Sequence, residues 1–161
     1  MTFNACPPEF VNHPSAIRAN PGPDSELSCC PRMEPIPSPE AVVAPRNVLG
    51  EPLQICGCEP MTGWWRDGSC RTDPSDGGLH TVCCVMTEAF LSYSRAQGND
   101  LSTPRPEFGF PGLRPGDHWC VCAGRWLEAH LDGLAPPVLL AACEERSLEL
   151  IPLELLRSCA A

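Results

Sequence analysis

The sequence contains no lysine, and this absence excludes several kinds of chemistry. All 11 basic residues are arginines, set against 20 acidic residues, so the formal net charge is −9. Schiff-base and lysine-nucleophile mechanisms need a lysine amine, and a P-loop needs a lysine to reach the phosphates of a nucleotide. Because nucleic-acid binding depends on a basic face that displaces counterions, we expect no nucleic-acid partner. An acidic surface equally disfavours docking on anionic lipid.

Targeting signals and long apolar runs are also lacking. The N-terminus, MTFNACPPEF, has neither a basic n-region nor an apolar h-region, so we expect that it is not a secretory signal. No apolar run approaches the ~18 residues that span a bilayer. We therefore predict a soluble, cytoplasmic protein with no membrane partner. Thiols stay reduced in the cytoplasm, so the 12 cysteines favour buried thiols, metal ligands or redox chemistry over a disulfide framework.

Proline divides the chain into two parts. Residues 1–46 hold 10 of the 20 prolines, and proline removes amide donors and biases the preceding residue away from helix. We expect residues 1–46 to form a disordered or loosely docked arm and residues 47–161 to form one cysteine-rich domain. The arm contains the pair Cys29-Cys30, a possible redox or metal handle that we interpret as incidental.

The domain alternates between strand and helix patterns. The β-branched, apolar run His80–Met86 predicts a buried strand. Thr87 follows as an N-cap, and Gly98 ends the helix that it starts. The sequence also predicts a short strand before Cys56, a hairpin turn at Asp67-Gly68, strands at His118–Ala123 and Pro137–Ala142, and helices at about 125–131 and at Leu153–Ser158.

These elements predict an α+β fold, a two-layer sandwich with a small mixed or antiparallel sheet and about three helices. A long loop from Asn99 leads into the His118 strand. Loops longer than about a dozen residues in a compact domain are usually functional or disordered. Because Phe108, Phe110 and Leu113 give this loop side chains of its own to pack, we expect it to be ordered.

Several segments together resemble the bacterial domain-of-unknown-function family 2237, namely NVLGEPL, PMTGWWRDGSC, HTVC, GNDLSTPRPEFGFPGL, PGDHWCVCAGRW and PLELL. The resemblance covers roughly residues 47–156. It implies a small two-layer α+β domain and brings no activity with it. It also separates the cysteines of the domain: the family pattern passes through Cys56, Cys70, Cys83, Cys120 and Cys122, whereas Cys58, Cys84, Cys143 and Cys159 are additions in this chain.

A metal site is the first functional hypothesis. Cys120 and Cys122 lie two positions apart on a predicted strand, so their side chains point to one face. Four thiolates, or three with one imidazole, suit Zn²⁺ at about 2.1–2.3 Å. Cys-x-Cys is not the usual Cys-x₂-Cys knuckle, so buried structural thiols remain the alternative. The candidate ligands are Cys56, Cys70, His80, Cys83, Cys120 and Cys122, with zinc as the possible cofactor.

Thiol chemistry is the second hypothesis. A nucleophilic cysteine needs a nearby cation or a helix N-terminus that lowers its pKa. His80 could act on Cys83 or Cys84, and Arg125 could act on Cys120. No Cys-x-x-Cys motif is present, which disfavours a thioredoxin-like protein.

Binding of a small molecule is the third hypothesis. Arg66 could hold a carboxylate or phosphate through two parallel hydrogen bonds, in a cleft shared with Asp100 beside the long loop. The structural alternative is that Asn99 caps a helix and Asp100 forms an Asx turn. The candidate ligand-binding residues are Arg66, Asn99, Asp100, Asp117 and Arg125. We thus predict a thiolate-rich metal-binding or structural-thiol domain, with a small-molecule-binding module or cysteine-dependent enzyme as the alternative.

Overall fold

The computed structural model describes residues 44–161. Its elements are, in chain order, β1 (Val82–Val85), α1 (Glu88–Ala96), the 3₁₀ helix η1 (Pro106–Phe108), β2 (His118–Val121), α2 (Ala123–Leu131), the 3₁₀ helices η2 (Leu140–Ala142) and η3 (Glu145–Glu149), and α3 (Leu153–Ser158). The predicted α+β class is confirmed, with a two-stranded antiparallel sheet and three α-helices in this part of the chain. The predicted arm, residues 1–46, lies outside the described residues except for its last three positions.

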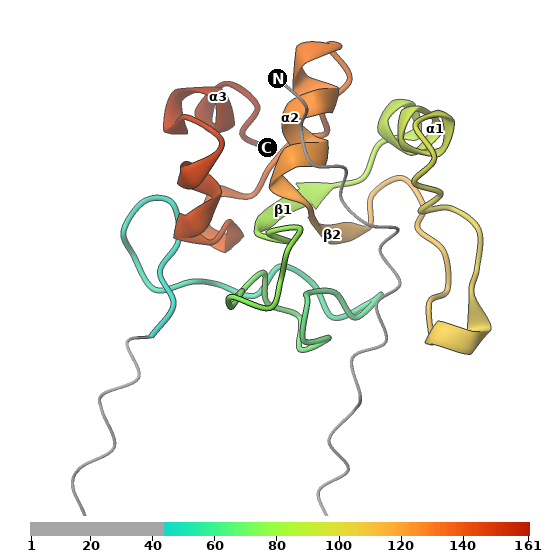
Figure 1. The fold of residues 1–161 in the computed structure, drawn as a ribbon, viewed down its shortest axis with the longest axis horizontal. Helices are drawn as coiled ribbons and strands as arrows, with labels where there is room; N and C mark the ends of the chain where they lie inside the picture. Colours follow the sequence, from blue (N-terminus) through green and yellow to red (C-terminus); the bar gives the residue numbers. More distant parts are fainter. Residues whose placement is uncertain (1–43) are drawn as a thin grey trace, which may run out of the picture. The chain divides into compact units, whose positions relative to one another are not determined.

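Strands β1 and β2 pair so that Cys83 lies opposite Cys120 and Cys84 lies opposite Trp119. Figure 1 shows α2 and α3 on one side of the strands and the irregular segment 47–80 on the other. Both faces of β1 are therefore covered, which explains why its sequence, VCCV, is apolar throughout rather than alternating. A two-stranded sheet is marginal in water, so this one depends on what packs against it.

Helix α1 begins and ends where its sequence predicts. The hydroxyl oxygen of Thr87 accepts a hydrogen bond from the backbone N–H of Phe90 at 3.1 Å, which satisfies one of the free donors of the first turn. Phe90 and Leu91 face the core, and Gly98 follows the helix with a φ of +84°. This local signal places the end of β1 and the start of the long loop.

The prediction of a strand at Pro137–Ala142 was wrong. Only Val138 forms bridges, to Cys84 and to Ala160, and the chain then turns into η2. Pro137 has no N–H with which to extend a ladder of hydrogen bonds, so pairing is confined to one residue. The predicted His118–Ala123 strand is also shorter than expected, because Cys122 leaves the strand and becomes the N-cap residue of α2.

The segment 47–80 contains isolated bridges and no strand. Asp67-Gly68 makes a turn, with a φ of +83° at Gly68, but the predicted hairpin and the short strand before Cys56 were wrong. The backbone groups at the turn are used inside the loop: the N–H of Gly68 donates to Thr62 and its carbonyl accepts from Cys56, both at distances below 3.0 Å. Strands could not pair through the same groups.

The long loop before β2 packs against the core, as expected. Phe110 and Leu113 are buried, whereas Phe108 is 38% exposed. Gly112 has a φ of +77°, and a Cβ at that position would lie 2.4 Å from the carbonyl oxygen of Ser102, so the loop closes tightly on itself there. Among the described residues, no helix is long and apolar enough to cross a membrane.

Candidate functional site

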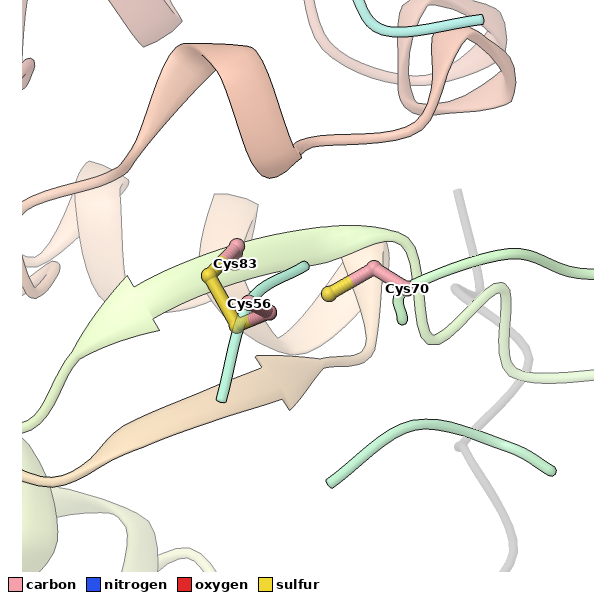
Figure 2. A group of neighbouring side chains, drawn as sticks. All are labelled: Cys56, Cys70 and Cys83. Atoms are coloured by element: carbon pink, nitrogen blue, oxygen red, sulfur yellow. A yellow bond between two sulfur atoms is a disulfide. The ribbon is translucent and has the colours of Figure 1, made fainter. Parts of the chain in front are cut away.

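Two disulfides lie side by side beneath the sheet. Cys56 is bonded to Cys83, and Cys70 is bonded to Cys120. Because Cys83 and Cys120 are direct partners across β1 and β2, both bridges tie segment 47–80 to the same place on the sheet. Figure 2 shows the Cys56–Cys83 bond with the sulfur of Cys70 next to it. The expectation that thiols prevail over disulfides was therefore wrong for these four cysteines.

The sulfur atoms of Cys56, Cys70 and Cys83 all lie within 4.8 Å of one another and are buried. This buried cluster could hold a metal ion by its spacing. The thiolate is the form of cysteine that ligates metals, and a disulfide sulfur is not a thiolate. The geometry therefore fits a metal only when the bridges are reduced.

His80 and Cys122, the other two candidate ligands, form a separate group with Asp76. The His80 Nε2 atom lies 3.2 Å from the Sγ atom of Cys122. The opposite ring nitrogen, Nδ1, lies 2.6 Å from Oδ1 of Asp76. The imidazole thus stands between a carboxylate and a sulfur, which is the arrangement that activates a nucleophilic cysteine. Cys122 is itself disulfide-bonded in the structure.

The side chain of Asp76 has no exposed surface, and hydrogen bonds hold its carboxylate in place. Its carboxylate accepts from the Thr72 hydroxyl at 2.8 Å, from the backbone N–H of His80 at 2.8 Å and from that of Gly78 at 3.2 Å. Burial alone would raise the pKa of Asp76, but the hydrogen bonds and the positive charge of His80 outweigh it and hold the pKa below its usual value. Asp76 is therefore an anion that orients the ring of His80.

A strained residue joins this group to helix α2. Leu79 has a φ of +49°, a left-handed conformation that residues with a Cβ seldom adopt. Its carbonyl accepts a hydrogen bond at 2.9 Å from the N–H of Ala123, the first residue of α2. That contact sets His80 beside Cys122 at the helix N-terminus, where the helix dipole favours negative charge. Trp64 stacks on the His80 ring with centroids 5.4 Å apart.

Free thiols occupy different places within residues 44–161. Cys84 and Cys143 are buried, Cys159 is partly buried, and Cys58 is exposed. Burial raises the pKa of Cys143 to about 12 and the pKa of Cys84 well above its ordinary value, which is the property of an inert core thiol. The prediction that His80 activates Cys83 or Cys84 was wrong, because Cys83 is bridged and the ring faces Cys122. These four free thiols are the four cysteines that the sequence resemblance predicts to be additions in this chain.

The candidate ligand-binding residues each have local partners. The Arg66 guanidinium lies 4.7 Å from the ring centroid of Trp119. The carbonyl of Asn99 accepts from the Ser94 hydroxyl at 2.7 Å, which closes the end of α1. Asp117 accepts from the N–H of Arg114 at 2.8 Å, and Arg125 pairs with Glu128 at 3.0 Å.

Asp100 forms an Asx turn. Its carboxylate accepts from the Ser102 N–H at 2.9 Å and from the Thr103 hydroxyl at 2.6 Å. The hydrogen bond from Thr103, with help from the backbone N–H groups, lowers the pKa of Asp100 to about 2. The Asx turn expected at Asp100 is thus confirmed, whereas the C-cap residue of α1 is Gln97 rather than Asn99. A shared ligand site with Arg66 stays a prediction.

Asp76 is the functional candidate that the sequence did not reveal. It lies in a polar Asp-Pro-Ser-Asp-Gly-Gly loop that resembles any solvated turn. The available signal was the spacing Asp76-x₃-His80 with two glycines between, which lets the chain fold back so that one side chain can reach the other.

One sequence-family model matches the chain over residues 46–160, and its description reads "Uncharacterized protein conserved in bacteria (DUF2237)". The match spans most of the chain and agrees with the segment in which the resemblance was found. No curated protein matches the chain.

Proposed function

Since the chain belongs to the DUF2237 family, whose description names no activity, we propose from the site itself that the domain carries out thiol–disulfide exchange at Cys122. The observation that carries this proposal is the line of contacts Asp76–His80–Cys122, with atoms 2.6 Å and 3.2 Å apart. His80 supplies positive charge to a departing thiolate. Asp76 holds the ring with Nε2 toward the sulfur and stabilises its protonated form.

The exchange step balances as an ordinary two-electron reduction. One thiolate of an incoming dithiol attacks the sulfur that is bonded to Cys122. The S–S bond breaks, and Cys122 leaves as a thiolate beside the His80 imidazolium and the N-terminus of α2. The second thiol of the dithiol then resolves the mixed disulfide, so the dithiol is oxidised and two cysteines are reduced. A stabilised thiolate is a better leaving group, which speeds the first step.

Exchange suits this site better than acyl transfer does. Acyl transfer needs backbone donors that face a developing oxyanion. The first donor at the start of α2, the N–H of Ala123, is already bound to the carbonyl of Leu79. Disulfide exchange needs a disulfide, and a neighbouring imidazole and a helix N-terminus stabilise the departing thiolate; Cys122 is disulfide-bonded and lies beside His80 at the start of α2.

The test is a mapped partial reduction of the native chain near neutral pH. A dithiol is added in small amounts, released thiols are trapped with an alkylating agent, and mass spectrometry identifies the labelled cysteines. We expect Cys122 to be labelled before Cys56, Cys70, Cys83 and Cys120. Reduction of those four ahead of Cys122, or at the same rate, would overturn the proposal.

A second candidate function, metal binding, is favoured by a separate observation, the three sulfurs within 4.8 Å of one another. Zn²⁺ is the ion that thiolate sets of this kind prefer. The predicted cytoplasmic location would supply the reducing conditions that such a site needs. The test is elemental analysis of the reduced protein for bound zinc.

A further inference from the structure

We propose that disulfides and a metal ion are alternative occupants of one site made by Cys56, Cys70, Cys83 and Cys120, so that reduction switches metal binding on. This inference rests on the second candidate function and adds to it the identity of the fourth ligand and the redox condition. Two dithiols reduce the two bridges to four thiols and become two disulfides. One divalent thiophilic ion such as Zn²⁺ then replaces four protons.

Strand pairing brings the four sulfurs together independently of their covalent bonds. Cys83 and Cys120 are direct partners in the antiparallel register, and such partners have Cβ atoms about 4.5–5.5 Å apart on one face of the sheet. Each meets one cysteine of segment 47–80, Cys56 or Cys70. The sulfurs of Cys56, Cys70 and Cys83 thus gather in one place, as Figure 2 shows, and Cys120 is attached to that group through its bond to Cys70.

Three of the four sulfurs already lie near the spacing of a tetrahedral metal site. A Zn–S distance of about 2.3 Å in a tetrahedron places sulfurs about 3.8 Å apart. The sulfurs of Cys56, Cys70 and Cys83 already lie within 4.8 Å of one another. Reduction lengthens each S–S pair from bonded to contact distance, and the metal draws the two pairs together.

Contacts that do not involve sulfur hold segment 47–80 on the sheet after reduction. The hydroxyl of Thr62 accepts a hydrogen bond from the backbone N–H of Cys120 at 2.8 Å. The His118 Nδ1 atom lies 2.8 Å from the carbonyl oxygen of Cys56. The two hydrogen bonds involve the backbone of two of the four ligands themselves. The ligands thus stay near one another, which lowers the entropy lost on metal binding.

The remaining candidate ligands lie outside this set. The Nε2 atom of His80 faces Cys122, and its Nδ1 atom faces Asp76. Among the described residues, the group of sulfurs close enough for a metal is Cys56, Cys70 and Cys83. Cys120 adjoins this group through its bond to Cys70, whereas His80 and Cys122 lie against each other. The six residues predicted from the sequence therefore separate into four metal ligands and two members of the exchange site.

The test compares the full chain in its two redox states. Reduced protein, freed of dithiol under anaerobic conditions, and untreated protein are each dialysed against Zn²⁺, and bound zinc is measured. We expect about one ion per reduced chain and none per oxidised chain, the stoichiometry of a four-sulfur site. Co²⁺ in place of Zn²⁺ should give the intense charge-transfer absorption of tetrahedral thiolate ligation in the reduced state alone.

A matched pair of variants tests which sulfurs are the ligands. Cys83→Ser removes a proposed ligand, and Cys84→Ser changes the neighbouring, equally buried residue of β1, a free thiol. We expect Cys83→Ser to weaken zinc binding by roughly 10- to 100-fold or more. Cys84→Ser should leave zinc binding unchanged. Circular dichroism of both reduced variants shows whether they remain folded.

The outcomes distinguish a failure of metal binding from a failure of the redox switch. Absence of zinc from the reduced wild-type chain would overturn metal binding altogether. Zinc bound equally by the oxidised chain, or retained by a folded Cys83→Ser variant, would leave metal binding standing and overturn the redox switch at these four cysteines. The wild-type comparison needs no variant, so a variant that fails to fold does not remove the test.

Discussion

The two ends of helix α2 each hold a histidine next to a cysteine. At the N-terminus, His80 lies 3.2 Å from the sulfur of Cys122. At the C-terminal end, His130 in the last turn lies 3.6 Å from the sulfur of Cys159. Each imidazole is also stacked on a tryptophan, with centroids 5.4 Å apart for Trp64 and His80 and 5.1 Å apart for Trp126 and His130.

The pairs differ in what surrounds them. The other ring nitrogen of His80 contacts the buried carboxylate of Asp76. The sulfur that His80 contacts, that of Cys122, lies at the positive, N-terminal end of α2. Cys159 is the C-cap residue of α3, the end of a helix where the dipole disfavours an anion. Under the exchange proposal, a stacked histidine alone does not make a sulfur reactive, and the carboxylate and the helix end are the elements that distinguish the two.

The largest effect should come from removing the imidazoles. His80→Gln is expected to slow alkylation of Cys122 roughly 10- to 100-fold near neutral pH in dithiol-reduced protein, because its thiolate fraction falls to that of an ordinary thiol. His130→Gln, the matched variant, should change alkylation of Cys159 by less than about threefold. Rates come from timed labelling and mass spectrometry. An equal slowing in both variants would show that the two pairs do not differ.

A smaller effect should follow from removing only the charge of the carboxylate. Asp76→Asn keeps the size of the side chain but no longer stabilises the His80 imidazolium. We expect alkylation of Cys122 to slow about tenfold, the change that corresponds to one pKa unit of lost ion pairing. Cys159 in the same variant serves as the internal control, since its histidine does not contact Asp76. An unchanged alkylation rate at Cys122 would show that Asp76 has no role in the exchange site.

Acid stability offers a second measure of the same carboxylate. The pKa of Asp76 is lower in the folded state than its usual value, so its contribution to stability is present above the unfolded-state pKa of ~3.9 and is lost as the pH falls through the folded-state value. Urea unfolding should therefore show wild type more stable than Asp76→Asn at about pH 6, with a smaller difference at about pH 3. A difference that grows in acid would contradict this assignment.

The smallest effect concerns the strained residue between the His80 loop and α2. Leu79 has a φ of +49°, which costs a residue with a Cβ about 1–2 kcal/mol. Leu79→Gly and Leu79→Ala both lose the side chain, but only glycine relieves the strain. Urea unfolding should thus find the glycine variant more stable than the alanine variant by up to ~1 kcal/mol, after the greater chain entropy of glycine is allowed for. An alanine variant that is the more stable would show that no strain is stored there.

Local signals predicted the elements that surround the site. Thr87 and Gly98 fixed the ends of α1 because capping depends on residues within one turn. The β-branched run after His80 fixed β1 in the same way. The segment 47–80 was not predictable by these means, because its turn at Asp67 and Gly68 is held by hydrogen bonds of Gly68 with Thr62 and Cys56 inside an irregular loop, where no strand or helix pattern applies.

Cysteine pairing escaped prediction for a physical reason. Whether Cys83 bonds Cys56 depends on the register of β1 against β2 and on the path of segment 47–80, and neither is encoded within a few residues of either cysteine. The sequence predicts Cys122 as a strand residue, whereas the structure shows it as the N-cap of α2, with a φ of −54° and a ψ of 130°. Its contact with His80 joins residues 42 positions apart.

Because β1 contains two adjacent cysteines, the choice of cysteine that forms the disulfide reports the register of the strand. Cys83 points to segment 47–80 and is bridged, while Cys84 points the other way and is free. Side chains alternate along a strand, so a slip of one residue would present Cys84 to Cys56 in place of Cys83. A Cys56–Cys84 bond in refolded material would therefore identify chains whose strands had paired one position out of step, and the native bond, once formed, locks the correct alignment.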